Sequence, residues 1–242
     1  MTWTKGEFQY EGKAKRAYLV KEDEGKLWLE FKDSLTAFNG QKTGSFAKKG
    51  AINCQITALA FKVLKENDVP SHFVEQVSET EMIGDKLKII PLEVVVRNRL
   101  AGSTAKKFGI KEGSPLEQPL VEFYYKNDDL QDPFVSDDQA LMLKAVSEQK
   151  SLNELKDRTR RINKILLNFF ASAGLDLVDF KLEFGWSANG EMVLGDEITP
   201  DTCRLWDKVS GERMDKDRFR RDLGNVAETY QEVLNRLKAC WE

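Results

Sequence analysis

Apolar residues recur every three or four positions in three stretches of the chain, which predicts helices. The first stretch covers residues 51–66 and ends before Asn67, with Pro70 beyond. Capping-box patterns at residues 136–139 and 151–154 begin further helical segments, the second of which ends at Gly174. The last helix is expected over residues 217–238. Such stripes are typical of helix faces packed on a core.

Other stretches alternate or are continuously apolar, which predicts strands over residues 8–20, 26–31, 73–77, 86–90 and 92–100. The later residues 116–133 are rich in Pro, Asn and Asp and are expected to be irregular. Ile89-Ile90-Pro91 marks a candidate crossing from a β-rich unit, residues 1–90, into a larger unit, residues 91–242. The predicted fold class is α+β, with mostly antiparallel sheets that carry helices on their faces.

The stretch LVDFKLEFGWSANGEMVLGDEI, residues 177–198, reads as a hairpin with Asn189-Gly190 at its turn. Asn-Gly favours a two-residue type I′ turn, because both central residues need a positive φ. That register puts Glu183 directly opposite Asp196, where like charges repel. A Mg²⁺ ion would offset the repulsion, since it commonly takes one or two carboxylates plus substrate phosphates. The open alternative is a surface hairpin whose acids face water, because a slip of one residue exchanges the faces.

The first strand of this hairpin separates its polar residues from its apolar ones. Its apolar face comprises Val178, Phe180, Leu182 and Phe184, and its polar face comprises Asp179, Lys181 and Glu183. Three charged groups in a row on one face of a strand indicate the wall of a cleft.

The composition narrows the function classes. The chain has 242 residues, of which 41% are hydrophobic, so it can bury a sizeable core. A net charge of −3 argues against a general binder of nucleic acid or membrane surfaces, which would need a basic excess. The sequence shows neither a membrane-spanning apolar run nor a secretory signal at its N-terminus. We therefore expect a soluble, cytoplasmic protein.

Histidine and cysteine are scarce, which restricts the chemistry further. The only histidine, His72, is expected to be an ordinary residue at a strand edge, and the three cysteines are widely spread. A Ser-His or Cys-His nucleophile pair would have to use His72, and zinc ligation by histidines is nearly excluded. Catalysis would then rest on carboxylates, lysines, arginines and a metal, which suits phosphoryl transfer.

A basic segment lies in the first predicted strand. Lys13 and Lys15 would share one face of that strand, and Gly12 permits close backbone approach. Two ammonium groups beside small residues suit a nucleotide polyphosphate, although the GxxxxGK[ST] loop is absent. The alternative is a solvated basic edge strand.

The buried strand predicted over residues 92–100, in the second unit, contains two arginines. Glu93, Arg97 and Arg99 project to one side of that strand, whose other face is apolar, and Ser103 falls near the N-cap of a short helix. Arginines beside a helix N-terminus favour a phosphate site. A structural ion pair between Glu93 and Arg97 is the alternative.

The loop after the second hairpin strand offers another candidate clamp for a phosphate or carboxylate, Arg204. Its neighbour Cys203 could be a thiol of lowered pKa. No partner base is visible for it, so we take Cys203 as a bystander.

Six segments of the chain, in order, resemble the signature segments of the phosphoribosylaminoimidazole-succinocarboxamide synthase (SAICAR synthetase) family. They are YEGKAKRAY, FNGQKTGSFAKKGAIN, PLEVVVRNRLAGS, KNDDLQDP, LVDFKLEFG and LGDEITPDTCRLWD, and the match runs from about residue 10 to residue 221. The resemblance implies an ATP-grasp-like fold, with a small N-terminal nucleotide-binding domain and a larger α+β domain around the active-site cleft. It also implies a homodimer. At residues 201–204 the chain departs from the family pattern, which has small residues before the arginine.

The implied reaction joins L-aspartate to the carboxylate of carboxyaminoimidazole ribotide, with ATP and Mg²⁺. The residues that match the family's ATP contacts are Gly12, Lys13, Ala14, Lys15 and Lys126, and those that match its magnesium-binding acids are Glu183 and Asp196. The positions around the ribotide are Glu93, Arg97, Ser103, Asp179, Lys181 and Arg204, and the catalytic roles fall on Lys13, Asp179, Lys181 and Arg204.

Three functions are compatible with these residues. A synthetase would activate the ribotide carboxylate as an acyl phosphate, which the aspartate amine then attacks. A small-molecule kinase with a related ATP cleft would phosphorylate a hydroxyl without aspartate. A nucleotide-sensing module would bind ATP and hydrolyse none.

Overall fold

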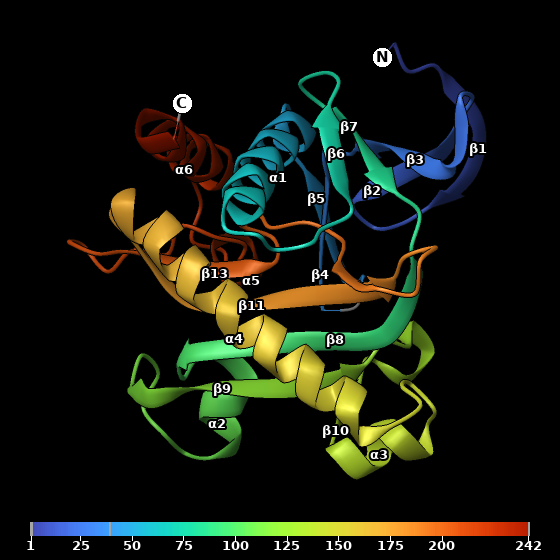
Figure 1. Ribbon diagram of the computed structural model, residues 1–242. Helices are drawn as coiled ribbons and strands as arrows, with labels where there is room; N and C mark the ends of the chain where they lie inside the picture. Colours follow the sequence, from blue (N-terminus) through green and yellow to red (C-terminus); the bar gives the residue numbers. More distant parts are fainter. Residues whose placement is uncertain (1, 39, 242) are drawn as a thin grey trace.

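The computed structural model describes residues 2–38 and 40–241, which form an α+β fold with three sheets (Figure 1). The first sheet is antiparallel and has the strand order β1-β2-β3-β7-β6. Its strands are β1 (Lys5–Glu11), β2 (Lys15–Val20), β3 (Asp23–Phe31), β6 (Phe73–Gln76) and β7 (Glu81–Asp85). The predicted strand over residues 8–20 is therefore two strands joined by a tight turn at residues 12–14.

The second sheet has six strands, in the order β10-β9-β8-β11-β12, with β13 also paired to β11. Its strands are β8 (Lys88–Arg99), β9 (Pro115–Tyr125), β10 (Phe134–Val135), β11 (Leu175–Trp186), β12 (Met192–Leu194) and β13 (Cys203–Asp207). All of these pairings are antiparallel. A separate two-stranded sheet consists of β4 (Ser34–Ala37) and β5 (Lys42–Ser45).

The helices are α1 (Lys49–Glu66), α2 (Gly102–Lys107), α3 (Asp137–Met142), α4 (Gln149–Ser172), α5 (Asp217–Arg220) and α6 (Val226–Trp241), with a 3₁₀ turn at Asp128–Leu130. Helices α1 and α4 pack on the core faces of the first and the six-stranded sheet, respectively, and α2 and α5 lie beside Arg204 on the other face of the six-stranded sheet. The long helix α4 runs diagonally across β8, β9 and β11, and α1 lies between α6 and β6 (Figure 1).

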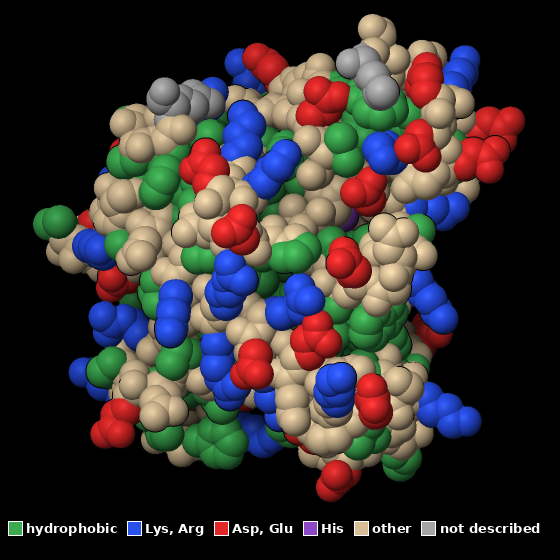
Figure 2. All heavy atoms as spheres, viewed as in Figure 1, with side chains coloured by type: hydrophobic (Ala, Val, Ile, Leu, Met, Phe, Trp, Pro, Cys, Tyr) green, Lys and Arg blue, Asp and Glu red, His purple; other side chains and the backbone are tan. Residues whose placement is uncertain are grey.

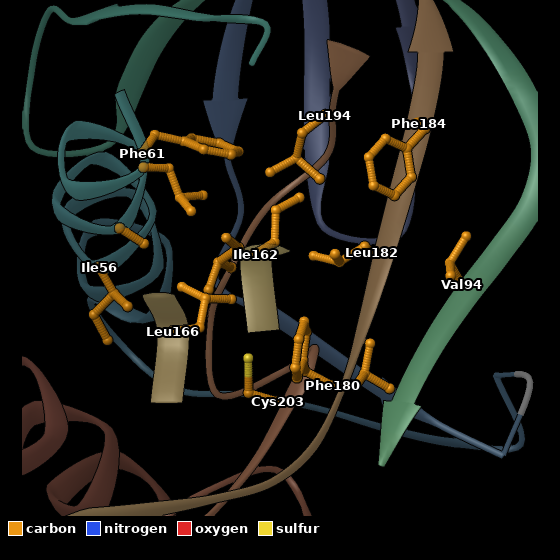
Figure 3. Packing of buried hydrophobic residues seen from close by; sticks show 14 of the residues in the cluster. Ile56, Phe61, Val94, Ile162, Leu166, Phe180, Leu182, Phe184, Leu194 and Cys203 are labelled. Atoms are coloured by element: carbon orange, nitrogen blue, oxygen red, sulfur yellow. The ribbon is translucent and has the colours of Figure 1, made fainter. Parts of the chain in front are cut away.

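The core lies between the helices and β11. Phe180 and Leu182 point from β11 toward Ile162 and Leu166 of α4 (Figure 3), and each of these four side chains is at most 2% exposed. The predicted apolar face of this strand is therefore the core face. Its polar face lies on the other side of the sheet, because successive side chains of a strand point to opposite faces.

Four predictions about elements are corrected. The strands predicted over residues 86–90 and 92–100 are one strand, β8, so the candidate crossing at residues 89–91 lies inside it. Residues 116–133 are not irregular, because most of them belong to β9 and pair with β8. The capping box at residues 136–139 is present, but the one at 151–154 lies inside α4, which begins at Gln149. The last helix is divided into α5 and α6 by a segment in which Asp222, Gly224 and Asn225 all have positive φ.

The surface carries both signs of charge. On the face seen in Figure 2, basic and acidic side chains are interspersed over the helices and strands. Within the described residues, none of the helices is both long enough and apolar enough to cross a membrane.

Candidate active site

A cleft of about 930 Å³ is lined by the first sheet on one side and by the six-stranded sheet on the other. Most residues to which the sequence gave a site role lie on its walls: Gly12, Lys13, Ala14, Lys15, Glu93, Arg97, Ser103, Lys126, Asp179, Lys181, Glu183, Asp196 and Arg204. These residues span most of the chain, and the two sheets bring them to one place. Arg99, also predicted to serve a phosphate site, is not among the lining residues and pairs with Asp176 (3.4 Å). Asn39, in one of the matched segments, lies outside the described residues.

The turn between β11 and β12 is longer than predicted. Phe184 pairs with Leu194, and the N–H of Ser187 donates to the carbonyl of Glu191 (2.9 Å). The loop therefore has three residues, with Gly190 in the left-handed region (φ 78°), as three-residue hairpin loops require. The predicted register is wrong, because the residue opposite Glu183 is Gly195, whose N–H donates to the Glu183 carbonyl (2.9 Å).

Asp196 nevertheless reaches the same side of the sheet as Glu183. The strand β12 ends at Leu194 and Asp196 has a φ of 58°, so the alternation of a strand no longer applies there. The Nζ atom of Lys181 lies 2.6 Å from the Glu183 carboxylate and 3.2 Å from that of Asp196. The two acids thus contact one ammonium group. The alternative of a solvated surface hairpin is wrong, since Glu183 is only 4% exposed.

Two further lysines reach these acids from other elements. Lys15, on β2, lies 2.7 Å from Asp196 and 2.9 Å from Glu197, and Lys126, after β9, lies 2.6 Å from Glu183. Burial by itself would raise the pKa of Asp196, but Lys15 and Lys181 hold it well below its usual value. Burial would likewise lower the pKa of Lys181, but its carboxylate partners hold it well above the ordinary value. Asp196 and Lys181 are therefore both charged at neutral pH.

Lys13 and Lys15 do not share a strand face as predicted. Lys13 lies in the turn between β1 and β2, where its half-exposed ammonium pairs with Asp128 (2.6 Å). Lys15 begins β2 and turns its side chain to the acids across the cleft. The basic edge strand is therefore the wrong alternative for Lys15, whereas Lys13 is a half-exposed cation on the wall of the cleft.

Arginines and one carboxylate form the other end of the cleft. Arg97 binds Glu122 (2.7 Å) and Asp179 (2.9 Å), and Arg204 binds Asp179 as well (2.8 Å). The predicted alternative of a structural ion pair holds for Arg97, whose partners are the buried Glu122 and Asp179, but the partner named for it is wrong, because Glu93 pairs with Lys181 instead (3.2 Å). Asp179 thus accepts from two guanidinium groups, which fixes both of them beside the cleft.

The first turn of α2 lies close to Arg204. Gly102 has a φ of 61°, and a Cβ atom added there would come within 2.7 Å of the Arg204 Nη2 atom. Glycine is therefore required for both conformation and space. Ser103 follows it in this turn and faces the cleft.

Several residues of the site were missed by sequence reasoning. Glu197, 4% exposed, binds Lys15 together with Asp196, although strand alternation would put neighbours on opposite faces. Asp217, expected only as the start of a helix, accepts from Arg204 (3.0 Å) and Arg220 (2.6 Å). The only signal in the sequence is the density of acids and bases in residues 212–222, a pattern also typical of exposed surfaces.

His72 and Cys203 take no part as nucleophiles or bases. His72 is buried rather than at a solvated edge, and its Nε2 atom lies 3.1 Å from the Asp196 carbonyl oxygen. Burial, with the nearby Lys15, lowers the pKa of His72 to about 4, so the ring is neutral. Burial raises the pKa of the Cys203 thiol well above its usual value, so it is no thiolate.

The carboxylates have the donor chemistry that magnesium prefers. Glu183 and Asp196 offer only oxygen ligands, and both are inside the cleft. No cluster of three metal-ligating His, Cys, Asp or Glu side chains occurs in residues 2–38 and 40–241. A site that takes its remaining ligands from substrate phosphates and water fits these two acids.

Comparisons with known proteins agree on one family. The family model described as SAICAR synthetase matches residues 8–237. The phosphoribosylaminoimidazole-succinocarboxamide synthase of Nautilia profundicola is 53% identical over 229 residues, which are 95% of this chain and 97% of that protein. The crystal structure of the same-named protein from Ehrlichia chaffeensis has a TM-score of 0.92 at 42% identity, covering 96% of this chain and 99% of the other. A structure described as SAICAR synthetase (Type-2) in complex with ADP has a TM-score of 0.92 at 43% identity, covering 96% and 98%.

Proposed function

Because the chain belongs to the SAICAR synthetase family, we propose that its cleft joins L-aspartate to the carboxylate of carboxyaminoimidazole ribotide. The protein is an ATP-dependent ligase of purine biosynthesis, and ATP goes to ADP and phosphate. One observation carries the assignment of residues: the acids, lysines and arginines that match the family's site positions all line one cleft between two sheets.

The nucleotide phosphates bind at the turn that holds Gly12, Lys13 and Ala14. Lys15 and Lys126 extend this positive wall into the cleft, where each already contacts a buried carboxylate. Lys13 is supported in this role by its exposure, since its contact with Asp128 is a surface pair that a phosphate can replace at little cost.

Glu183 and Asp196 would hold Mg²⁺ when nucleotide is present. The bound ion would supply positive charge that offsets the charge developing on the transferring phosphate. Lys15 and Lys181 hold the pKa of Asp196 well below its usual value, which keeps this carboxylate in the form that binds a metal.

The ribotide lies against the arginine end of the cleft. Arg204 and Ser103 contact its phosphate, while Arg97 holds Asp179 in place and acts through it. Glu93 and Lys181 then lie next to the reacting carboxylate, with Lys181 contacting both Glu93 and the metal-binding acids. Fixed partners of this kind convert an encounter into an oriented reaction.

The chemistry follows from these positions. A carboxylate is a poor acyl donor, so the ribotide carboxylate first attacks the terminal phosphate of ATP and becomes an acyl phosphate. Lys181 and Lys13 stabilise the negative charge of the transferring group. The aspartate amine then attacks the acyl carbon, loses a proton and expels phosphate.

The finer architecture is part of the same proposal. An ATP-grasp-like arrangement would divide the chain near residue 90, and the change from β7 in one sheet to β8 in the other supports that boundary. The homodimer stays a prediction from the resemblance.

Release of ADP, measured with ribotide alone, with aspartate alone and with both, tests the proposed function. We expect release only when both substrates are present. Release that is unchanged when aspartate is omitted would indicate a kinase. No release in any mixture, with ATP still bound, would indicate a sensing module.

A further inference from the structure

His72 lies where the two large sheets meet at the edge of the cleft. It precedes β6 of the first sheet, and its carbonyl accepts from the N–H of Asp85 at the end of β7 (2.7 Å). Its own N–H donates to the carbonyl of Leu194, the last residue of β12 in the six-stranded sheet (2.8 Å). Ser71 and Leu194 form an isolated parallel bridge beside this bond. The backbone of His72 therefore joins the two walls of the cleft.

The His72 ring is held in one orientation by its neighbours. Only 6% of the residue is exposed, and the ring packs edge-on against Phe61 of α1, with 5.4 Å between the ring centroids. Gly84 on β7 leaves room for the ring, because a Cβ atom added there would lie 2.9 Å from the Nδ1 atom. A side chain packed this closely has little freedom to rotate. The Nε2 atom thus keeps its direction toward the loop after β12.

The Nε2 atom of His72 donates a hydrogen bond to the backbone of Asp196. The distance from Nε2 to the Asp196 carbonyl oxygen is 3.1 Å. A carbonyl oxygen only accepts hydrogen bonds, so the hydrogen is on Nε2. A nitrogen that carries a hydrogen has no free lone pair for a metal, so Nε2 is not itself a ligand. The effect of His72 on a metal in the cleft therefore passes through Asp196.

The backbone at Asp196 needs such a contact. Its φ of 58° lies in the left-handed region, which is unfavourable for a residue with a Cβ atom. The strand β12 ends two residues earlier, so its pairing does not extend to Asp196. The neighbouring Gly195 N–H donates to the Glu183 carbonyl (2.9 Å), and His72 holds the residues on either side of Gly195. These contacts together fix the turn that carries Asp196 into the cleft.

The lysines that contact the Asp196 carboxylate cannot replace His72 in this role. Lys15 (2.7 Å) and Lys181 (3.2 Å) contact the carboxylate oxygens in the free protein. A metal ion binds through the same oxygens and competes with those contacts. The bond from His72 goes to the carbonyl instead, so it persists when the carboxylate takes a metal. It is therefore the contact that can aim this carboxylate in the metal-bound protein.

We propose that His72 is a positioning residue for Mg²⁺. Its Nε2–H group holds the carbonyl of Asp196 and thereby aims the Asp196 carboxylate at the ion that Glu183 also binds. The inference rests on the proposed function, which assigns the metal to these two acids. It adds that the first sheet, through His72, sets the affinity for a metal bound on the other wall of the cleft.

Binding of Mn²⁺ in the presence of ADP, followed by electron paramagnetic resonance, tests the inference. Mn²⁺ prefers the same oxygen ligands as Mg²⁺, and its signal reports binding without turnover. His72→Leu removes the donor and should raise the Kd of Mn²⁺ about tenfold or more, as the loss of a group that orients a metal ligand commonly does. His72→Gln should keep the Kd near the wild-type value, because its amide N–H can donate to the same carbonyl. The affinity for ADP without metal should stay unchanged in both variants.

Two further variants guard against a general loss of structure. Ser71→Ala is the matched control, because Ser71 pairs with β12 through its backbone and the substitution should leave the Kd of Mn²⁺ unchanged. Gly84→Ala displaces the His72 ring but keeps the imidazole, so the Kd should rise as it does in His72→Leu. This second variant decides the question if His72→Leu fails to fold.

The results separate this inference from the proposed function. If Asp196→Asn binds Mn²⁺ as tightly as the wild type, the proposed metal site fails. If Asp196→Asn loses Mn²⁺ but His72→Leu and Gly84→Ala keep it, only the inference is overturned. Equal losses in His72→Leu and His72→Gln would indicate that the shape of the ring matters rather than its hydrogen bond, and would also overturn it. Weaker binding of ADP without metal would assign His72 to the nucleotide, with the same consequence.

Discussion

At the scale of single residues, the cleft is organised by side chains that share partners. Lys181 contacts Glu93, Glu183 and Asp196, and Asp179 contacts both Arg97 and Arg204. Shared partners keep like charges close together, because Glu183, Asp196 and Asp179 are each paired with two cations. A substrate can therefore exchange one contact of a residue while the others hold its side chain in place.

Glu183→Gln separates a catalytic role from a structural one. Turnover should fall about 100-fold or more, since a neutral amide is a poor ligand for Mg²⁺. Lys181 keeps two other carboxylates and the amide oxygen still accepts hydrogen bonds, so the thermal midpoint should move by less than about 4 °C. Measurements of the turnover rate and of the thermal midpoint check these two expectations. The control is Glu191→Gln, at an exposed acid on the same hairpin; a large loss of stability in Glu183→Gln alone would mark that residue as structural.

Gly102→Ala tests the close approach of Arg204 to α2. A Cβ atom there would displace the Arg204 guanidinium, so the KM for ribotide should rise roughly tenfold, with about 1 kcal/mol of stability lost to the left-handed backbone. Gly109→Ala is the matched control, because Gly109 has a φ of 63° and nothing within 4 Å of the added atom. It should lose similar stability and keep the ribotide KM. Equal KM effects in the two variants would contradict the steric argument.

At the scale of elements, short loops after β12 and β13 decide which residues face the cleft. The buried Asp215 connects strand β13 to helix α5. Its carboxylate accepts hydrogen bonds from the N–H groups of Leu205 on β13 (2.8 Å) and Asp217 in α5 (2.6 Å). Through this carboxylate, the core strand positions α5, whose Arg220 lines the cleft. The site thus depends on a buried acid that does not line the cleft.

Asp215 should make stability depend on pH. Burial, then the neighbouring Asp217, raise the pKa of Asp215 from 3.8 to about 7. Between these values the folded chain keeps a proton that the unfolded chain has lost, so the free energy of unfolding falls as the pH rises, by on the order of 4 kcal/mol across the window. Chemical denaturation at several pH values measures this free energy of unfolding. The value for the wild type minus the value for Asp215→Asn should decline from pH 5 to pH 7 and then level off. A difference that stays constant over this range would contradict the raised pKa.

At the scale of the whole molecule, one continuous core connects the two sheets that form the cleft. Helix α1 packs against β6 and β7 of the first sheet and also against α4 and α6, which cover the second. Buried residues of both sheets therefore belong to one hydrophobic cluster. The walls of the cleft are held by the same packing that holds the fold.

Nucleotide binding should accordingly stabilise the chain as a single unit. ADP with Mg²⁺ at about 100 times its Kd adds about 2.7 kcal/mol, which raises the thermal midpoint by roughly 5–10 °C in one cooperative transition. In Asp196→Asn, the part of the increase that depends on Mg²⁺ should disappear. Scanning calorimetry with ADP, with Mg²⁺ alone and with both checks this. Two transitions, of which only one moves, would contradict a common core.

The sequence by itself determined the fold class, the two faces of β11 and many of the residues that line the cleft. The alternation Val178 to Phe184 depends only on the local backbone period, and the short motifs of the family identify Lys15, Glu183 and Arg204 wherever the fold puts them. Tertiary structure decided which charges pair. Asp196 faces the cleft because its backbone turns left-handed, against the register that Asn-Gly predicts, and Glu197 and Asp217 join the site because distant cations approach them. These charge pairings depend on how the two sheets pack against each other. Burial and charge balance favour them, and no local sequence pattern encodes them.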